Sequence, residues 1–305
     1  MAEPVSPTRE GFLAADGHRI HWEYFGDGSH EAVCLLNGLA MHTKAWGPFL
    51  PLIHPEFDVL LYDYLGQGQS DAPDEPVSIS GLAAHLTAIM DALGVARVHT
   101  MGISYGGFVA IEHARQFPDR LHTLTLSGII LSREELFEMY EALSLRFYAL
   151  GPDHFGLYTH YLYEKIFGES FLRRVGRDAL EPMRQRFEAR YKDQIHCLVR
   201  LTEAQEEYFG RLDERMPEYR AVTVPTLLMP GEHDRVVLPC TQRKMLEVFP
   251  NSRWLPIPDC GHTAHLEQPG VFFGNLKAFM AAKSTAFAAG GEGRAAVASP
   301  APLSR

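Results

Sequence analysis

The sequence has few cysteines, and none of them form a closely spaced pair. Its four cysteines, Cys34, Cys197, Cys240 and Cys260, are scattered over 305 residues without a CxxC spacing. Zinc sites and disulfide frameworks both need cysteines at closer or more regular spacing. We therefore expect reduced, buried thiols and no metal site.

Long apolar runs and basic stretches are also missing. The first residues, MAEPVSPTREGF, carry Glu3, Arg9 and Glu10 where a secretory signal would need an apolar segment. No apolar run approaches membrane-spanning length, and the formal net charge of -10 argues against nucleic acid and anionic membranes as partners. We expect a soluble, cytoplasmic protein without a membrane span, monomeric or homodimeric, that acts on a small molecule.

Strand patterns alternate with helix patterns through most of the chain. The apolar runs EAVCLLNG and DVLLYDY are typical of buried parallel strands, and SGLAAHLTAIMDALG predicts an amphipathic helix that ends at Gly94. RVHTMGIS predicts the next strand, and GGFVAIEHARQF predicts a helix that stops at Pro118. This alternation predicts an α/β fold: a doubly wound, mostly parallel sheet with helices on both faces.

One segment interrupts the alternation. Residues 132–220 show only helical periodicity and are rich in aromatic residues, among them Tyr148, Tyr158 and Tyr161. Ser132 with Glu135 has the spacing of a capping box at the start of this segment. We predict a core made of residues 1–131 and 221–283, a helical cap over residues 132–220, and a disordered Ala, Gly and Pro-rich tail over residues 284–305. Most of the cap aromatics are expected to pack its helices, although such a cap also suits an apolar pocket.

A single serine between glycines stands at a strand-to-helix junction. Gly102-Ile103-Ser104-Tyr105-Gly106 matches the G-x-S-x-G pattern, in which a serine nucleophile sits on a strained turn at the carboxyl end of a strand. Serine needs a base, and the base needs an orienting acid. The sequence therefore predicts Ser104 as a nucleophile whose partners come from other loops.

Candidates for both partners follow later strands in the order serine, acid, histidine. Asp234 follows the strand pattern TVPTLLM, and His262 follows Gly261 in the loop after WLPI. Glu232 is an alternative acid, but it lies only one residue after Gly231, close to the strand end. His265 is expected in the following turn.

These segments together resemble the α/β-hydrolase superfamily. The resemblance is carried by LLNGLAMHTKAW, LLYDYLGQGQSDAP, MGISYGGFVAIEHARQFPDR, LLMPGEHDRVV and IPDCGHTAHLEQP, and it covers residues 12–131 and 221–283. It implies an eight-stranded core with a helical cap inserted after the sixth strand, and a triad of Ser104, Asp234 and His262. It also implies an oxyanion hole made by the backbone amides of Leu39 and Tyr105. The serine separates this chain from the similar haloalkane dehalogenases and epoxide hydrolases, which carry aspartate there.

The chain departs from the commonest family pattern at one strand end. It has Asn37-Gly38 where most relatives have His-Gly. This form resembles a subset that includes intracellular polyhydroxyalkanoate depolymerases and the hydroxyacyl transferases of rhamnolipid-type synthesis. The resemblance implies a medium-length or hydroxylated acyl group, with Asn37, Gly38 and His42 as possible substrate contacts.

Several functions share this set of residues. The first is hydrolysis of a carboxylic ester, lactone or thioester through an acyl-enzyme; the second is acyl transfer to an alcohol or thiol. Hydrolysis of a carbon-carbon bond and formation of peracids use the same triad. A non-catalytic binding module is a minor alternative, and no metal or organic cofactor is expected.

Overall fold

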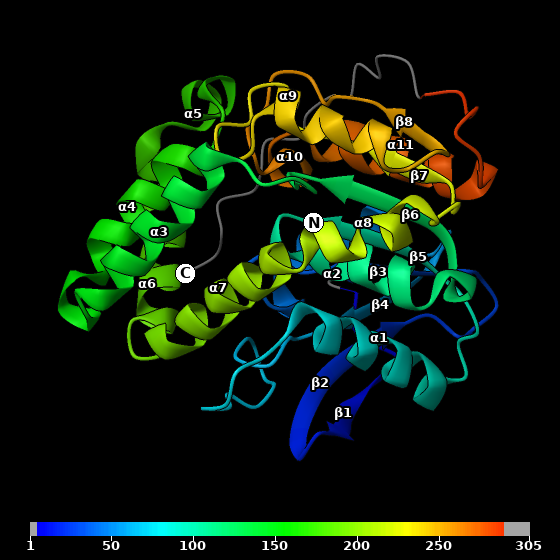
Figure 1. Ribbon diagram of the computed structural model, residues 1–305, viewed down its shortest axis with the longest axis horizontal. Coiled ribbons are helices and arrows are strands. Elements are labelled where there is room, and N and C mark those ends of the chain that lie inside the picture. The colour runs from blue at the N-terminus through cyan, green and yellow to red at the C-terminus, as the bar shows by residue number, and fades with distance from the viewer. Residues whose placement is uncertain (1–4, 290–305) are drawn as a thin grey trace.

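A single eight-stranded sheet forms the centre of the molecule (Figure 1). The computed structural model describes residues 5–289, and the strands follow the order β1-β2-β4-β3-β5-β6-β7-β8. Only the β1–β2 and β2–β4 pairs are antiparallel, so the predicted α/β fold with a mostly parallel eight-stranded sheet is confirmed. The strands are β1 (Arg9–Ala15), β2 (His18–Phe25), β3 (Ala32–Leu36), β4 (Asp58–Tyr62), β5 (Val98–Ile103), β6 (Leu121–Ser127), β7 (Thr226–Leu228) and β8 (Ser252–Trp254).

Helices cover both faces of this sheet. All residues of β3, β4 and β5 are buried, which requires apolar layers on either side. One layer is built by α1 (Ile79–Leu93) and α2 (Tyr105–Gln116), and the other by η1 (Thr43–Leu52) and α11 (Pro269–Ala282). The shorter helices are η2 (Pro118–Arg120), α9 (Pro239–Gln242), η4 (Arg243–Glu247) and α10 (Ala264–Glu267).

A helical insertion separates β6 from β7. It contains α3 (Glu135–Ala149), η3 (Pro152–His154), α4 (Phe155–Ile166), α5 (Glu169–Val175), α6 (Arg177–Tyr191), α7 (Ile195–Gly210) and α8 (Leu212–Arg220). Helices α3 to α6 lie to the left of the sheet in Figure 1, and α7 and α8 lead back toward α1 and α2. We call these helices the cap. Tyr148, Phe155, Tyr158, Tyr191 and Leu198 form a cluster of their own inside it, so aromatic packing holds the cap helices together.

The expected capping box at the start of the cap is wrong. Helix α3 begins at Glu135 with Glu134 as its N-cap, and the N-cap side chain makes no capping bond. The hydroxyl of Ser132 instead donates to the Glu134 carboxylate at 2.6 Å, and Lys244 binds the same carboxylate oxygen at 2.6 Å. Ser132 lies three residues before the helix and is engaged outside it. Helix α1, by contrast, ends at Leu93 and is followed by Gly94 in the left-handed conformation, as its sequence indicates; its N-cap is Ser78, whose side chain accepts the Gly81 amide.

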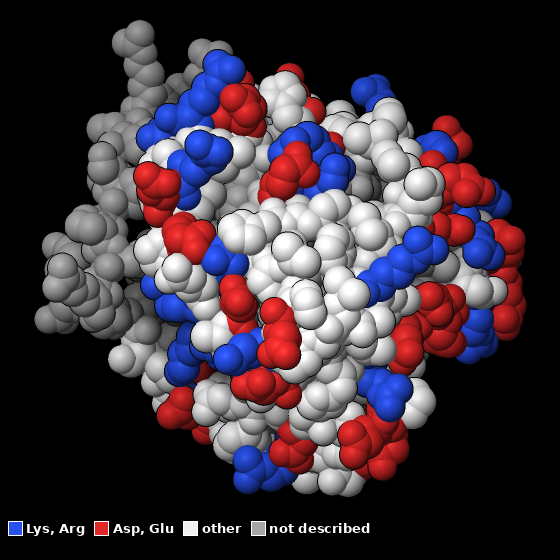
Figure 2. Space-filling model, turned by 90° about the vertical axis from the view of Figure 1, so that its left-hand side faces the viewer, with Lys and Arg blue, Asp and Glu red and all other residues white. Residues whose placement is uncertain are grey.

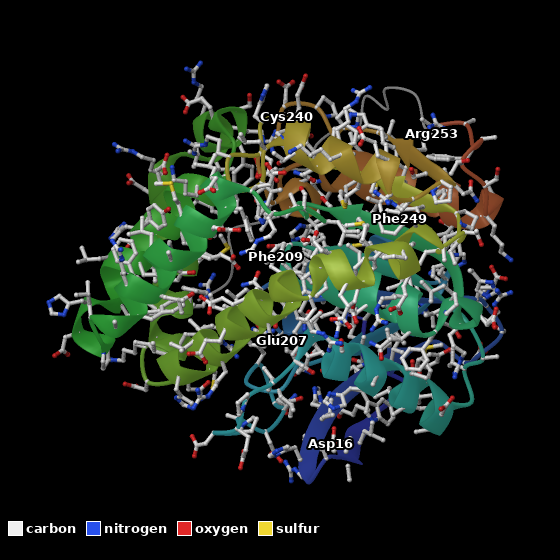
Figure 3. All side chains as sticks on the ribbon, in the orientation of Figure 1. Asp16, Glu207, Phe209, Cys240, Phe249 and Arg253 are labelled. Atoms are coloured by element: carbon white, nitrogen blue, oxygen red, sulfur yellow. The ribbon has the colours of Figure 1, made fainter. Side chains whose placement is uncertain are left out.

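Acidic and basic side chains mix on one face of the molecule, and three of the four cysteines are buried. Figure 2 shows acidic and basic side chains interspersed on the face formed by the left-hand side of Figure 1. Cys34, Cys197 and Cys260 are buried, but Cys240 is exposed on α9 near the upper edge of the molecule in Figure 3, so the expectation of a buried thiol is wrong there.

No helix within residues 5–289 has the length and apolar character needed to cross a bilayer.

The start of the predicted tail packs on the core. Phe287 is buried, and its ring lies 5.4 Å from that of Phe279 on α11, with the Arg253 guanidinium 4.4 Å from its centre. Arg253 also donates to the Thr285 carbonyl at 3.2 Å, and the Thr285 hydroxyl donates to Asn251 at 3.2 Å, so ring packing and hydrogen bonds together hold this segment on the core. The remaining part of the predicted tail, residues 290–305, lies outside the described residues.

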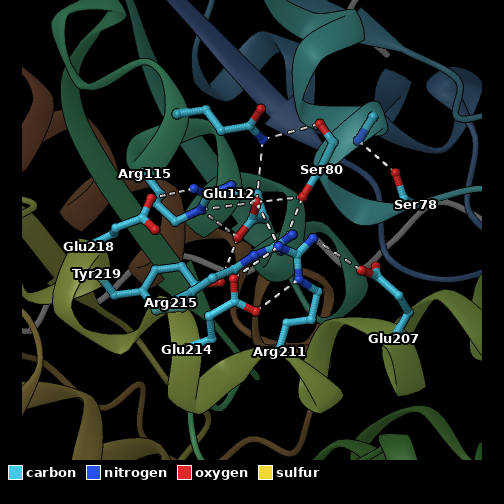
Figure 4. Close-up of polar contacts among 12 residues, drawn as sticks. Ser78, Ser80, Glu112, Arg115, Glu207, Arg211, Glu214, Arg215, Glu218 and Tyr219 are labelled. Carbon is cyan, nitrogen blue, oxygen red and sulfur yellow. Dashed lines mark hydrogen bonds and ion pairs between the residues drawn. The ribbon is translucent and has the colours of Figure 1, made fainter.

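A buried carboxylate joins the last cap helix to the core (Figure 4). Glu112 of α2 is fully buried and accepts hydrogen bonds from Tyr219 of α8 at 2.5 Å, from Ser80 of α1 at 2.7 Å and from Arg115 at 2.8 Å. Burial opposes its ionisation, but the hydrogen bonds from Arg115, Tyr219 and Ser80 outweigh burial and hold the pKa of Glu112 below its ordinary value. The guanidinium of Arg215, also on α8, lies 3.5 Å from the same carboxylate.

The hydrogen bonds to Glu112, which we call the Glu112 joint between cap and core, lead to a prediction about stability. Tyr219→Phe removes one hydrogen bond to a buried charge while keeping the ring, so the free energy of unfolding at pH 7 should fall by roughly 1.5–3 kcal/mol. Urea denaturation monitored by circular dichroism measures this loss. A loss below about 0.5 kcal/mol, the usual scale for neutral surface changes, would show that the bond does not hold the joint.

Candidate active site

Ser104 lies on a strained turn between the central strand β5 and helix α2. Its backbone has φ 49° and ψ -124°, a conformation rare for residues with a side chain, and its amide donates to the Ser127 carbonyl at 2.8 Å. A Cβ on Gly102 would lie 2.3 Å from the carbonyl oxygen of Gly106, and one on Gly106 would lie 2.4 Å from that of Leu36. Both glycines are required by this packing. Ser104 itself stays partly exposed among buried neighbours.

Ser104, His262 and Asp234 form one continuous hydrogen-bonded line. The distance from Ser104 Oγ to His262 Nε2 is 2.9 Å, and that from His262 Nδ1 to Asp234 Oδ2 is also 2.9 Å. The three residues come from loops that follow β5, β7 and β8. The sequence placed all three candidates at the carboxyl ends of strands, and parallel packing brings these ends to one edge of the sheet.

The carboxylate of Asp234 is held by more donors than the sequence suggested. The backbone amides of Val236 and Val237 each donate to its Oδ1 at 2.9 Å, and the amide of Gln242 donates to Oδ2 at 3.0 Å. Gln242 also accepts from the backbone amide of Gly128 at 3.1 Å, so it bridges the acid loop to the end of β6. Sequence reasoning missed Gln242 because nothing in its local pattern marks a contact with a residue eight positions earlier.

Glu232 and His265, the residues weighed beside Asp234 and His262, lie outside the hydrogen-bonded line. The Glu232 side chain is 52% exposed and accepts the backbone amide of Asp259 at 3.3 Å. His265 is buried between the rings of Trp46, Phe49 and Phe272, and burial, followed by the charge of His262, lowers its pKa to about 3. His265 therefore acts as a neutral packing residue.

The loop after β3 reaches the nucleophile turn. A Cβ built on Gly38 would lie 3.7 Å from the Cβ of Ser104, which brings the expected oxyanion donor Leu39 and the backbone of Tyr105 to the same end of the sheet. The Asn37 side chain is directed elsewhere: its amide donates to the Tyr62 carbonyl at 2.9 Å, and its oxygen accepts from the Trp46 indole at 2.7 Å.

The hydrogen bonds of the Asn37 side chain bear on its expected role as a substrate contact. Both polar ends of this fully buried residue are used to hold the loop after β3, so a direct substrate contact by its side chain is not what the structure indicates. Burial, and then the charge of Arg190 on α6, lower the pKa of His42, so this side chain lies within reach of both the core and the cap.

Cap helix α3 carries a buried carboxyl in its middle. Glu141 is 7% exposed, and its Oε1 has no hydrogen-bond partner. Burial, followed by the charges of Glu206 and Glu138, raises the pKa of Glu141 to about 8. Burial and then the Glu141 charge raise the pKa of the Tyr105 phenol, whose oxygen is also without a hydrogen-bond partner. A carboxyl that keeps its proton at neutral pH therefore lies near the residue that follows Ser104.

The described residues also contain three clusters that could gather metal ligands. None of them includes a member of the hydrogen-bonded line, and each contains an exposed acidic residue, a common feature of surfaces that bind no metal. The clusters are Glu10, His21 and Glu23; Asp27, His30 and Asp58; and Glu232, His233 and Asp259.

Comparison with known proteins places this site in a family. The chain is 28% identical over 271 residues to a 2-hydroxy-6-oxononadienedioate/2-hydroxy-6-oxononatrienedioate hydrolase of Klebsiella pneumoniae subsp. pneumoniae, a match covering 83% of this chain and 88% of that protein. A thermophilic esterase from Thermogutta terrifontis has a similar structure, with a TM-score of 0.75, 23% identity, and coverage of 91% of this chain and 100% of the other. The enol-lactonase from Burkholderia xenovorans LB400 has a TM-score of 0.73 at 23% identity, covering 89% of this chain and 100% of the other.

The family model for the alpha/beta hydrolase fold matches residues 31–269. This range contains the nucleophile turn, the cap, and the loops that carry Asp234 and His262. The resemblance to the superfamily seen in the motifs is thereby confirmed, whereas the likeness of Asn37-Gly38 to one subset stays a prediction. The matched residues make up more than half of this chain, and the chain therefore belongs to the alpha/beta hydrolase fold family.

Proposed function

We propose that this protein hydrolyses a carboxylic ester or lactone, with Ser104 as nucleophile, His262 as base and Asp234 as the acid that orients the base. The observation that carries this proposal is the unbroken line of two 2.9 Å hydrogen bonds from Ser104 to Asp234. A serine hydroxyl becomes an effective nucleophile when a base removes its proton during attack. Ser104 is the partly exposed member of the line, so it is the one a substrate can reach.

The reaction proceeds in two halves. Ser104 Oγ bonds to the substrate carbonyl carbon while its proton moves to His262 Nε2, and His262 then gives that proton to the departing alcohol oxygen as the carbon-oxygen bond breaks. Water next attacks the acyl-enzyme, passes a proton to His262, and the acid leaves as the proton returns to Ser104. Throughout, Asp234 holds the ring by its Nδ1 and stabilises the positive charge that the ring gains.

The oxyanion formed in each half needs preorganised donors. We assign this role to the backbone amides of Leu39 and Tyr105, because the loop after β3 and the nucleophile turn meet at Ser104. One such donor contributes about 3 kcal/mol to the transition state in measured cases. Asn37 supports this role indirectly, since its bonds to Tyr62 and Trp46 fix the loop that carries Leu39.

Hydrolysis of a carbon-carbon bond is the second candidate, and the Klebsiella relative favours it. That protein is named for a hydroxy-keto dicarboxylate, whose cleavage could use the same serine, base and acid. Acyl transfer to an alcohol or thiol also uses these residues and differs only in the acceptor.

The charge of the interior argues against a dicarboxylate substrate. In this proposal the acyl group lies beside Glu141 and Tyr105, where the raised pKa of Glu141 supports a penalty on negative charge, so a substrate carboxylate there would meet the same penalty. Within residues 5–289, Arg184 and Arg215 are the buried cationic residues, and both bind carboxylates of the chain itself. We therefore propose a neutral acyl group.

Replacing the nucleophile tests the proposal directly. Ser104→Ala should lower kcat for 4-nitrophenyl butyrate by about 10⁴-fold to 10⁶-fold, because removal of a triad nucleophile leaves only binding and the oxyanion donors. A fluorophosphonate probe, located by mass spectrometry, should label Ser104 in the wild-type protein. Substantial turnover by the folded variant, or labelling at a different serine, would reject the assignment.

Substrate charge separates the two candidate functions. The wild-type protein should prefer 4-nitrophenyl butyrate over 4-nitrophenyl hemisuccinate by at least ~10-fold in kcat/KM, since about 1.4 kcal/mol of uncompensated charge burial is sufficient for that factor. The two esters have equal acyl length and differ in the terminal carboxylate. Faster turnover of 2-hydroxy-6-oxononadienedioate than of either ester would instead identify carbon-carbon hydrolysis as the reaction.

The protonated state of Glu141 has its own test. The native protein keeps this proton up to a pKa of about 8, whereas the unfolded chain releases it near the ordinary value of 4.5, so wild-type stability falls as pH rises between these values. Glu141→Gln lacks this dependence, and its free energy of unfolding relative to the wild type should rise by up to ~1.4 kcal/mol per pH unit over that window. The charged and titratable groups that interact with Glu141 are Glu138, Glu206, Tyr105 and Tyr140, and all of them remain in the variant. Urea denaturation at pH 5, 6, 7 and 8 measures the difference, and a constant difference would contradict the raised pKa.

A further inference from the structure

A short piece of the cap lies directly on the loop that carries His262. This piece, residues 166–168, consists of the last residue of α4 and the two residues that connect α4 to α5. The carbonyl oxygen of Ile166 accepts the backbone amides of His262 at 2.9 Å and of Thr263 at 3.3 Å. A Cβ on Gly168 would lie 2.7 Å from the backbone nitrogen of Gly261, and one on Gly261 would lie 2.5 Å from that of Gly168. The two backbones therefore touch, with no space for a side chain on either.

A buried carboxylate closes this contact. Glu267 of α10 is 1% exposed, and its Oε2 accepts the backbone amides of Gly168 and Gly261 at 3.0 Å each. Its Oε1 accepts the Thr263 hydroxyl at 2.9 Å. One carboxylate thus binds the cap and the residues on either side of His262, but not His262 itself.

We propose that Glu267 is a positioning residue that sets the place of the His262 ring and couples it to the cap. This role rests on the proposed function, because it acts through the base of the same site. Gly261 and Thr263 flank His262, so bonds to both fix the backbone from which the ring extends. The bond to Gly168 makes that backbone position depend on where the cap lies.

Physical chemistry favours an acid at this position. Backbone amides buried between two loops need acceptors, and one carboxylate oxygen can accept both amides with stronger bonds than a neutral acceptor gives. Ring placement matters because the proton transfer takes place over the 2.9 Å between Ser104 and His262, and a misplacement of about 1 Å at a reacting centre can cost ~100-fold in rate. A loosened loop should therefore reduce kcat more than it weakens substrate binding.

A second cap joint provides a matched control. Glu112 is likewise a fully buried acid between cap and core, but its partners lie on α1, α2 and α8. Tyr219→Phe weakens that joint without touching the His262 loop. Any loss of activity that arises only from a less stable cap should appear in this control as well.

The experiment measures kcat, KM and melting temperature with 4-nitrophenyl butyrate for the wild type and four variants. Glu267→Ala should lower kcat by about 30-fold to 100-fold with KM changed by less than ~3-fold. Glu267→Gln should stay within ~3-fold of wild-type kcat, because its amide oxygen can accept both backbone amides and its amide nitrogen can donate to Thr263. Tyr219→Phe should lose stability and keep wild-type kcat.

Gly168→Ala tests the same contact from the cap side. Its φ of -76° suits alanine, so the added methyl acts through its close contacts with the loop of the base, 2.7 Å from the Gly261 nitrogen and 2.9 Å from Glu267 Oε2. We expect kcat to fall by at least ~10-fold with Glu267 intact. This variant keeps the inference testable if Glu267→Ala does not fold.

A proton spectrum adds a readout that does not depend on turnover. The hydrogen on His262 Nδ1, bonded to Asp234, should give a low-field signal in the wild type and in Glu267→Gln, and the signal should broaden or vanish in Glu267→Ala. Wild-type kcat in folded Glu267→Ala or Gly168→Ala would overturn the positioning role, as would a loss of kcat in Tyr219→Phe equal to that in Glu267→Ala. Activity in Ser104→Ala would instead reject the proposed function, so the two failures are distinguishable.

Discussion

The turn between β5 and α2 holds Ser104 at φ 49°, in packing so close that Gly102 and Gly106 leave no room for a Cβ. This turn sits at the end of a central strand, with β3 on one side and β6 on the other. Its amide is fixed by Ser127 at the end of β6, and its approach to Leu36 fixes the end of β3. The position of the hydroxyl is therefore set by the sheet itself, and the loops after β3, β7 and β8 are arranged around it.

The local and the non-local parts of the site differ in how far the sequence reveals them. Strand and helix patterns carry their own periodicity, so the mostly parallel sheet and helix α1 with its end at Gly94 could be predicted. Ser104, Asp234 and His262 could also be selected, because each follows a strand and parallel strands bring such loops together. Gln242, Ile166 and Glu267 could not, because their contacts with the acid and base loops depend on how separate segments pack.

Polar side chains also take partners that their local sequence does not reveal. Ser132 and Glu135 have the spacing of a capping box, but the Ser132 hydroxyl is taken by Glu134, and Glu134 is held in turn by Lys244 from a distant helix. Asn37 was a candidate substrate contact because of its place before Gly38, yet the indole of Trp46 uses its oxygen. In both cases a polar side chain with a plausible local role is engaged by a partner that only the fold supplies.

Three buried acids near the site differ in the donors they receive, and this difference indicates what each can do. Asp234 accepts from two backbone amides, Gln242 and the His262 ring, so its negative charge is held in place opposite the base. Glu267 accepts from two backbone amides and a hydroxyl, which makes it a fixed link between the cap and the loop of the base. Glu141 has an oxygen without any donor, and its pKa is raised to about 8. The chain thus supplies donors where it needs negative charge for proton transfer and withholds them beside Tyr105, where an acyl chain would lie in our proposal. The same contrast that identifies Asp234 as the orienting acid therefore also favours an uncharged substrate.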